Sequence, residues 1–455
     1  MFWRLCSIVL LALASLRVNA ASLTDVIVTN GAAGSPVVKV AVIHEAPATI
    51  PSASDDLGRF TRQSPRKPAR ENVGTPDRLN HPGILDRSPN RIEAARKEFE
   101  EALKTYRELA QKEPETYLPS VAATLNDLGI LDSDQTRMEE TRKEHEQALK
   151  TYRELAQKEP ETYLPEVAQT LNNLGIVDNA QNRAEEARKA FTEALKIYRE
   201  LAQKKPGTYL PYVAITLNNL GTSDSAQNRL EAARKEYAEA LRIYRLLVHK
   251  NPENYLPEVA QMLNNLGLID SAQDRMAEAQ KEYEEGLKTY RKLAQKYPES
   301  YLPEVAQTLN NLGIVDSAQN RAEEARKAFT EALKIYRELE QKNPGTYLPY
   351  VATTLNNLGV LDHAQNRLEE ARKAFEETLK TYRELAEKNP ETYLPDVALA
   401  LNNLGILYSD QHQTEEARRA LEEALKIYEA YSKQNPEQFS SDVKRVKRLL
   451  EELHR

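Results

Sequence analysis

The stretch YLPEVAQTLNNLGIVDNAQNRAEEARKAFTEALKIYRELAQKKPGT, residues 163–208, is one copy of a unit that repeats every 46 residues. The opening Tyr-Leu-Pro recurs at this spacing, and the slot after the last copy holds another aromatic residue: Tyr117, Tyr163, Tyr209, Tyr255, Tyr301, Tyr347, Tyr393 and Phe439. A fixed period of this length is typical of a tandem array in which each unit packs on its neighbours. Such arrays present a long ribbed surface, which favours binding over catalysis.

Each unit contains two stretches with the periodicity of a helix. In the copy above, Leu164–Asn179 places apolar side chains three and four residues apart, with Pro165 expected in the first helical turn. The second stretch, Ala187–Leu201, has one apolar face opposite a charged one. Asn182 predicts a tight turn between the helices, and Pro206-Gly207 ends the second helix. The unit is therefore a helical hairpin whose apolar sides must be covered by neighbours.

Small and large residues recur where the two helices of a unit meet. In the copy above they are Leu171, Leu174 and Gly175 in the first helix, and Ala187, Phe191 and Ala194 in the second. This pattern resembles the tetratricopeptide repeat family, and it recurs in seven copies. The resemblance implies an all-α fold, a right-handed superhelical solenoid of helical hairpins. The unit is longer than the family's usual length of about 34 residues, and it is similar in layout to kinesin light chains and long-period bacterial repeats.

Two copies of the unit are almost identical. Residues 163–201 and 301–339 differ only at Asn179 against Ser317, and they lie three units apart. A block of three units has therefore been duplicated, and the array tolerates changes in its length.

The start of the chain predicts export. Residues 1–20 combine a short basic start, an apolar run of about a dozen residues and small residues before Ala20, which is typical of a cleaved signal peptide. The apolar run is too short to span a bilayer. The single cysteine, Cys6, lies inside this run, so the mature chain would form no disulfide. A periplasmic or secreted location is expected.

The rest of the chain divides by the presence of the repeat. Residues 21–70 are rich in proline and serine and predict a flexible leader, and residues 71–116 are interpreted as a degenerate N-terminal repeat in which Pro82 breaks the first helix. Seven full repeats are expected over residues 117–438, followed by a C-terminal capping helix within residues 439–455.

Composition and motifs argue against several classes of function. Charged residues make up 29% of the chain and the net charge is −7, with no basic stripe that would indicate a nucleic-acid partner. The chain has no glycine-rich phosphate loop and no His-Glu-x-x-His helix, although a serine triad would leave no such mark. We expect no enzymatic activity, no catalytic residues and no cofactor.

Paired asparagines are the strongest candidate for a binding site. The family resemblance implies that the second residue of each pair lines an inner groove and binds the backbone of a peptide, which assigns this role to Asn173, Asn219, Asn265, Asn311, Asn357 and Asn403. One helical turn earlier, the polar row is extended by Gln169, Gln261 and Gln307. An amide offers both a donor and an acceptor to an extended peptide. The alternative is that the asparagines bond across neighbouring helices or were simply multiplied by duplication.

The same helices carry no lysine or arginine between the Tyr-Leu-Pro and the following turn, which argues against a clamp for a terminal carboxylate. Their ends carry a column of carboxylates: Asp132, Asp178, Asp224, Asp270, Asp316 and Asp362. A divalent cation is one explanation, but one carboxylate per hairpin is too sparse for a cage. Pairing with arginines of the turns is favoured, namely Arg183, Arg229, Arg275, Arg321 and Arg367. No metal site is predicted.

Together these features predict an exported, non-enzymatic scaffold that binds proteins or extended peptides in the concave groove of its array. Two alternatives remain open: a secreted effector that acts on host proteins, and a regulator or assembly factor of an envelope enzyme complex. Neither nucleic acid nor a membrane span is expected, and the oligomeric state is undetermined.

Overall fold

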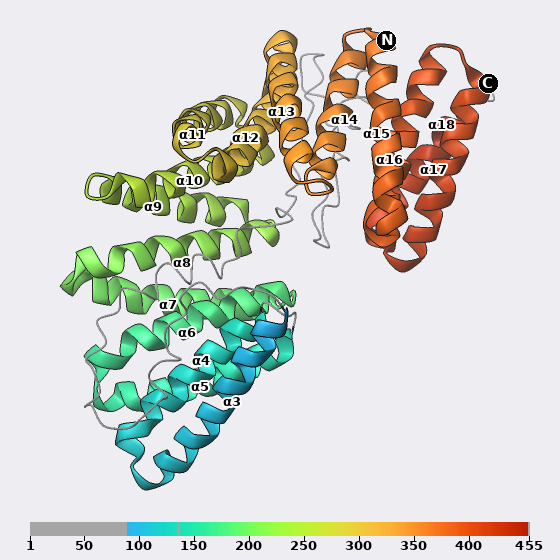
Figure 1. Cartoon of the computed structure of the whole chain (residues 1–455). Helices are drawn as coiled ribbons and strands as arrows, with labels where there is room; N and C mark the ends of the chain where they lie inside the picture. Colours follow the sequence, from blue (N-terminus) through green and yellow to red (C-terminus); the bar gives the residue numbers. More distant parts are fainter. Residues whose placement is uncertain (1–88, 134–136, 454–455) are drawn as a thin grey trace. The chain divides into compact units, whose positions relative to one another are not determined.

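The computed structural model describes residues 89–133 and 137–453, and within these it contains sixteen helices, α3 to α18. The predicted signal peptide, the leader and the first helix of the degenerate repeat lie outside the described residues. Figure 1 shows the helices in chain order. No helix among the described residues is both long enough and apolar enough to cross a membrane.

The helices alternate between the two kinds that the sequence predicts. The first helices of the hairpins are α4 (Pro114–Ser133), α6 (Pro160–Ala180), α8 (Pro206–Ala226), α10 (Pro252–Ala272), α12 (Pro298–Ala318), α14 (Leu348–Ala364), α16 (Pro390–Asp410) and α18 (Pro436–Leu453). The second helices are α3 (Pro89–Lys112), α5 (Met138–Lys158), α7 (Ala184–Lys204), α9 (Leu230–Val248), α11 (Met276–Lys296), α13 (Ala322–Lys342), α15 (Leu368–Lys388) and α17 (Thr414–Gln434). The predicted all-α fold of tandem hairpins is confirmed.

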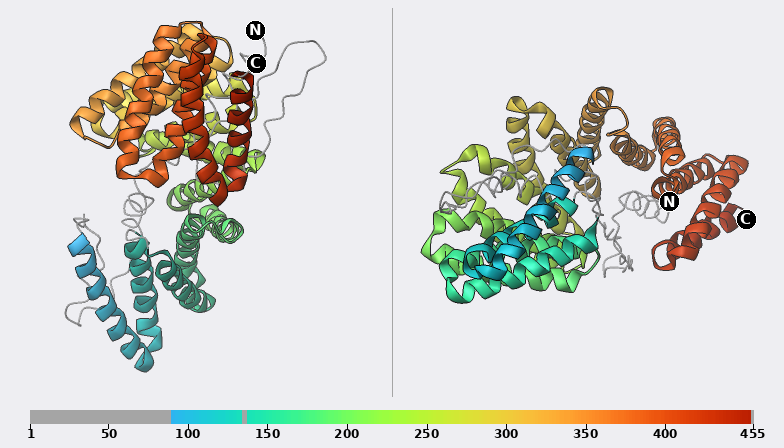
Figure 2. Two further views of the ribbon diagram at one scale, coloured as in Figure 1. Left: turned by 90° about the vertical axis from the view of Figure 1, so that its right-hand side faces the viewer. Right: turned by 60° about the horizontal axis from the view of Figure 1, so that its bottom comes forward.

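The described residues form two compact units, an N-terminal unit that ends at Tyr244 and a C-terminal unit that begins at Arg245, both within α9. Within each unit, helices that are adjacent in the sequence pack side by side (Figure 2). Successive first helices also contact one another, as α4 contacts α6 and α10 contacts α12. Each hairpin is therefore covered by its neighbours.

The helix joins are shorter than the sequence predicts. Only Glu159 separates α5 from α6, so α6 begins at Pro160 and Pro165 lies inside the helix. The prediction that this helix begins near Leu164 is wrong, because Pro160 already supplies the proline that favours a first helical position. Pro165 gives up one backbone hydrogen bond there, and the buried residues that follow it, Val167 and Ala168, stabilise the helix by packing.

The join before α14 is the exception. Glu340 stands where five other copies have alanine, and its carboxylate accepts hydrogen bonds from the backbone nitrogens of Gly345 and Tyr347, the latter at 2.7 Å. Gly345 has a φ of +88°, which glycine adopts without strain. These contacts unwind the first turn, so α14 begins at Leu348 rather than at Pro344.

The predicted turn at Asn182 is confirmed. Asn182 has a φ of 58°, and the equivalent residues of the other turns are also left-handed, namely Asn228, Asp274, Asn320, Asn366 and His412. Asparagine and aspartate tolerate this conformation better than other residues with a Cβ. The backbone nitrogen of Arg183 then donates to the carbonyl of Asp178 at 2.8 Å, which closes the turn.

Helices of a hairpin approach closely because glycine faces an aromatic ring. A Cβ placed on Gly175 would lie 2.6 Å from the ring of Phe191. In the first full repeat His145 takes the place of the ring against Gly129, and its Nδ1 lies 3.1 Å from Oδ1 of Asn126. Burial lowers the pKa of His145 to about 4, so this histidine is a neutral packing residue.

The last helix covers the end of the C-terminal unit. α18 begins at Pro436, three residues before the range 439–455 predicted for the capping helix, and it packs against α17. Phe439 and Val446 are buried in the same apolar cluster as Tyr428 of α17.

Candidate binding face of the first helices

One stripe of the first helices carries the predicted peptide-binding residues. In α6 it comprises Glu166, Gln169, Asn173, Ile176 and Ala180, which lie three or four residues apart and so share one side of the helix. We call this stripe, together with its equivalents in the other first helices, the first-helix face. Gln169 and its equivalents Gln261 and Gln307 are half-buried on this face.

The asparagine pairs form hydrogen bonds between successive repeats. The second asparagine of a repeat donates from Nδ2 to Oδ1 of the first residue of the pair in the preceding repeat: Asn173 to Asn126 (3.2 Å), Asn219 to Asn172 (3.1 Å), Asn357 to Asn310 (3.1 Å) and Asn403 to Asn356 (2.7 Å). Asn264 instead donates to Oγ1 of Thr308 at 2.7 Å. We call the four asparagine bonds the asparagine ladder.

Three of the six predicted peptide-binding asparagines are buried. Asn173 and Asn403 are each 2% exposed and Asn357 is 3% exposed, whereas Asn219, Asn265 and Asn311 are half-buried. This is the cross-helix arrangement that the sequence left open as the alternative. The peptide-binding role of the six asparagines stays a prediction, and the half-buried members of the row are the ones a ligand would reach.

The first-helix face has a distinctive charge pattern. The first helices α4, α6, α8, α10, α12, α14 and α16 contain no lysine or arginine, so the cations of these hairpins lie on the second helices and the joins between helices. The exposed acids at the starts of four first helices pair with lysines at the ends of the following second helices: Glu115 with Lys158 (2.9 Å), Glu161 with Lys204 (2.8 Å), Glu253 with Lys296 (2.5 Å) and Glu299 with Lys342 (2.6 Å). A second row of acids lies on the face itself, at Glu166, Glu258, Glu304 and Asp396.

The second helices present a different surface, a regular series of ion pairs. Arginine of one second helix pairs with glutamate of the next: Arg153 with Glu193 (2.7 Å), Arg199 with Glu239 (2.7 Å), Arg291 with Glu331 (2.7 Å) and Arg383 with Glu423 (2.6 Å). Each pair is about half exposed, so each contributes at most about 1 kcal/mol. Because both signs of charge alternate along this surface, it does not select a partner of one charge.

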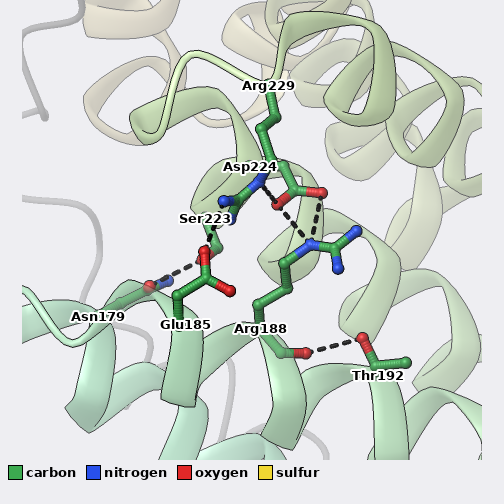
Figure 3. Close-up of polar contacts among 7 residues, drawn as sticks. All are labelled: Asn179, Glu185, Arg188, Thr192, Ser223, Asp224 and Arg229. Carbon is green, nitrogen blue, oxygen red and sulfur yellow. Dashed lines mark hydrogen bonds and ion pairs between the residues drawn. The ribbon is translucent and has the colours of Figure 1, made fainter. Parts of the chain in front are cut away.

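The aspartate column is held by arginines from two sources. Figure 3 shows Arg229 and Arg188 converging on the buried Asp224, with Nε–Oδ1 distances of 2.6 and 2.9 Å. The predicted pairing with turn arginines is confirmed at Asp224, at Asp270 (Arg275, 3.3 Å) and at Asp316 (Arg321). It is wrong at Asp178 and at Asp362, because Arg183 pairs with Glu139 at 2.6 Å and Arg367 with Glu323 at 2.7 Å instead.

The sequence analysis missed the arginines of the preceding second helix. Arg96 pairs with Asp132 (3.0 Å), Arg142 with Asp178 (2.8 Å), Arg188 with Asp224 (2.9 Å) and Arg326 with Asp362. The recurrence of arginine at this slot of the repeat is the sequence signal that could have identified them. These arginines tie each hairpin to its predecessor, so the column serves the packing of the array.

Two glutamates beside the aspartate column have raised pKa values, which the sequence did not predict. Burial, and then the charge of Asp224, raises the pKa of Glu236 to about 8, and burial with the charge of Asp132 raises the pKa of Glu144 to about 7. The equivalent residue is alanine in four other copies, at Ala190, Ala328, Ala374 and Ala420. These carboxyl groups therefore hold a proton near neutral pH.

Comparisons with known proteins identify the repeat. One sequence profile of the tetratricopeptide repeat matches residues 120–200, 258–338 and 383–430, and a second matches residues 213–251 and 351–391. The chain belongs to the tetratricopeptide repeat family. The predicted resemblance is thus confirmed, and tetratricopeptide repeats are typical of scaffolds that bind proteins or peptides. No curated protein sequence matches the chain.

Solved structures show the same fold. A signal transduction ATPase with a tetratricopeptide repeat sensor from Pyrococcus horikoshii aligns over 82% of this chain and 53% of its own, with 15% identity and a TM-score of 0.51. The quorum sensor NprR from B. thuringiensis aligns over 80% and 99%, with 16% identity and a TM-score of 0.42. A putative kinesin light chain with nearly identical repeats from Podosopora anserina aligns over 49% and 97%, with 16% identity and a TM-score of 0.39. At these identities the likeness is one of fold alone.

Proposed function

We propose that this tetratricopeptide repeat protein is a non-enzymatic scaffold that holds polypeptide partners along its first-helix face. The observation that carries the proposal is the repetition of one half-buried polar stripe. Gln169, Gln261 and Gln307 occupy the same slot of α6, α10 and α12, and each is followed one turn later by the second asparagine of its pair. An extended polypeptide repeats its backbone donors and acceptors at regular intervals, so a regular row of amides suits it.

The ladder refines which side chains contact the partner. Where the second asparagine is buried and donates to the preceding repeat, as Asn173 and Asn403 do, its first role is to fix the spacing of the helices. The half-buried glutamines and Asn219, Asn265 and Asn311 are then the ligand contacts.

Photo-cross-linking tests this face directly. A photoreactive amino acid replaces Gln261 or Gln307 on the first-helix face, and matched control variants carry it at the exposed Lys281 or Lys327 of the second helices. We expect cross-links to partner polypeptides in native extracts from the glutamine positions and few from the lysine positions. Equal cross-linking from both sets, or cross-linking from the lysines alone, would refute the assignment.

We also propose that the scaffold acts after export, on the strength of the signal-like residues 1–20. N-terminal sequencing of the protein isolated from its native host should find Ala21 as the first residue, and fractionation should place it in the periplasm or the medium. A mature chain that begins at Met1 in the cytosolic fraction would contradict export.

A further inference from the structure

Two clusters of tyrosines lie along the first-helix face, one in each unit. In the N-terminal unit, Tyr198 of α7 stacks on Tyr212 of α8 with ring centroids 5.2 Å apart, and Tyr209 lies 6.3 Å from Tyr212. In the C-terminal unit, Tyr336 of α13 stacks on Tyr350 of α14 at 5.2 Å, and Tyr347 lies 6.2 Å from Tyr350. The two arrangements are equivalent, residue for residue, three repeats apart.

A glutamate from the preceding first helix belongs to each cluster. Glu166 and Tyr212 occupy the same slot of the contacting helices α6 and α8, and Glu304 and Tyr350 occupy it in the contacting helices α12 and α14. In agreement with this placement, Glu166 adds to the effect of burial in raising the pKa of Tyr198 and Tyr209, and Glu299 and then Glu304 add to it at Tyr347. We call each set of three tyrosines and one glutamate a tyrosine–glutamate cluster.

The sequence restricts the clusters to two places. The residue three positions after the tyrosine of Tyr-Leu-Pro lies on the first-helix face, and it is tyrosine only at Tyr212 and Tyr350. In the repeat before each of them, the same slot holds Glu166 or Glu304, so an acid and an aromatic ring occupy the same slot of successive first helices. The duplication of the three-repeat block has therefore preserved the combination twice.

This combination of groups attracts a cation. The faces of tyrosine rings carry negative electrostatic potential and bind ammonium or guanidinium groups within about 6 Å, and a carboxylate beside them strengthens the attraction. Tyr209, Tyr212, Tyr347 and Tyr350 are partly exposed, while Tyr198 and Tyr336 are buried behind them. Because α6, α8, α12 and α14 contain no lysine or arginine, none of these four helices supplies a cation to the rings.

We propose that each tyrosine–glutamate cluster binds an arginine or lysine side chain of an extended polypeptide that lies on the first-helix face. The proposal rests on the scaffold function and adds the chemistry of the partner, which is a cationic segment. Arginine is favoured over lysine, because its planar guanidinium stacks on a ring while its N–H groups bond a carboxylate. The absence of lysine and arginine from α4, α6, α8, α10, α12, α14 and α16 makes an acidic segment or a terminal carboxylate an unfavourable ligand there.

Calorimetric titration of the full chain at low salt tests the proposal with three short peptides that alternate serine with arginine, lysine or glutamate. We expect binding of the arginine peptide, weaker binding of the lysine peptide and none of the glutamate peptide. Replacing Tyr212 and Tyr350 by leucine, or Glu166 and Glu304 by glutamine, should weaken arginine-peptide binding by roughly fivefold or more, the equivalent of one cation–π contact of about 1 kcal/mol.

The matched control removes the same charge elsewhere. Glu115→Gln with Glu253→Gln alters two exposed acids that already pair with lysines, so this variant should bind the arginine peptide as the parent does. Equal weakening in the control, or no weakening in either cluster variant, would overturn the proposal. Circular dichroism checks that each variant is folded, and Glu166→Gln is the milder change because it keeps the size of the side chain.

The outcome is separable from that of the scaffold proposal. If native partners cross-link from Gln261 and Gln307 but the cluster variants bind the arginine peptide normally, the scaffold function stands and the cationic partner fails. If the clusters bind the arginine peptide while partners cross-link only from the second helices, the clusters remain cation sites and the scaffold function on this face fails.

Discussion

Replacing Glu236 by glutamine should make the stability of the N-terminal unit less dependent on pH. Glu236 is half-buried beside Asp224, and burial together with that negative charge raises its pKa from 4.5 to about 8, although Arg188 and Arg229 partly oppose the shift. Between these two pKa values the folded chain binds a proton that the unfolded chain has released. Stability is therefore highest below about pH 4.5, falls as the pH rises towards 8, and is constant above it.

The size of the effect follows from the shift. A full shift from 4.5 to about 8 would correspond to about 5 kcal/mol, at about 1.4 kcal/mol per pKa unit. Because the carboxyl group is only partly removed from water, solvent screening reduces this figure, and we expect about 2 kcal/mol. Glutamine keeps the shape of the protonated acid but cannot ionise, so the variant should be about 2 kcal/mol more stable than the parent at pH 8 and equal to it near pH 4.5.

The assay is urea unfolding followed by circular dichroism at a series of pH values from 4.5 to 8.5, with amide hydrogen exchange of α8 and α9 as the local readout, because long arrays unfold in stages. The exposed Glu200 of α7 is a matched control, and Glu200→Gln should keep the pH dependence of the parent. If Glu236→Gln and the parent lose stability equally between pH 5 and 8, the assigned protonation of Glu236 is wrong.

Three further substitutions test the packing. Gly175→Ala places a Cβ 2.6 Å from the Phe191 ring and should lower the free energy of unfolding by about 1–3 kcal/mol. In the control Gly207→Ala the new Cβ meets no atom within 4 Å, so this variant should be neutral or stabilising. Comparable losses of stability in both variants would contradict the close approach of the two helices. Asn356→Ala leaves the buried Nδ2 of Asn403 without its acceptor and should lower the free energy of unfolding by about 1–3 kcal/mol. If a double-mutant cycle with Asn403→Ala gives no coupling energy, this hydrogen bond does not stabilise the array. Glu340→Ala should extend α14 back to Pro344, as α8 extends to Pro206, and unchanged backbone chemical shifts at Gly345 would show that Glu340 does not hold the join open.

The regular features of the fold were predictable because they repeat in the sequence. The 46-residue period predicted the hairpins, and Asn182 predicted a tight turn, which the structure shows to be left-handed. The start of α6 was placed a few residues too far along the chain, because Pro165 looks like a proline of the first helical turn. Only the structure shows that a single residue, Glu159, connects α5 to α6. Local pattern alone does not reveal how few residues connect two packed helices.

The candidate site was predictable in position but not in contacts. The asparagine row was expected on one side of the first helices, where the structure places it, yet the bond from Asn403 to Asn356 joins residues one repeat apart. The arginine that holds Asp178 is Arg142 of the preceding hairpin rather than the nearby Arg183. Both choices depend on how neighbouring hairpins are offset, which the sequence of one repeat does not contain.

The asparagine ladder gives the array a direction. Every bond in it runs from the second asparagine of one repeat to the first residue of the pair in the repeat before. The first pair supplies the acceptor Asn126, and the first residue of the last pair is Asn402. Both amide atoms of Asn402 are buried without a hydrogen-bond partner among the described residues, because Arg448 and Leu449 of α18 occupy the slots of the next pair. A further copy of the unit inserted before α18 would offer the Nδ2 of its second asparagine to the acceptor Oδ1 of Asn402.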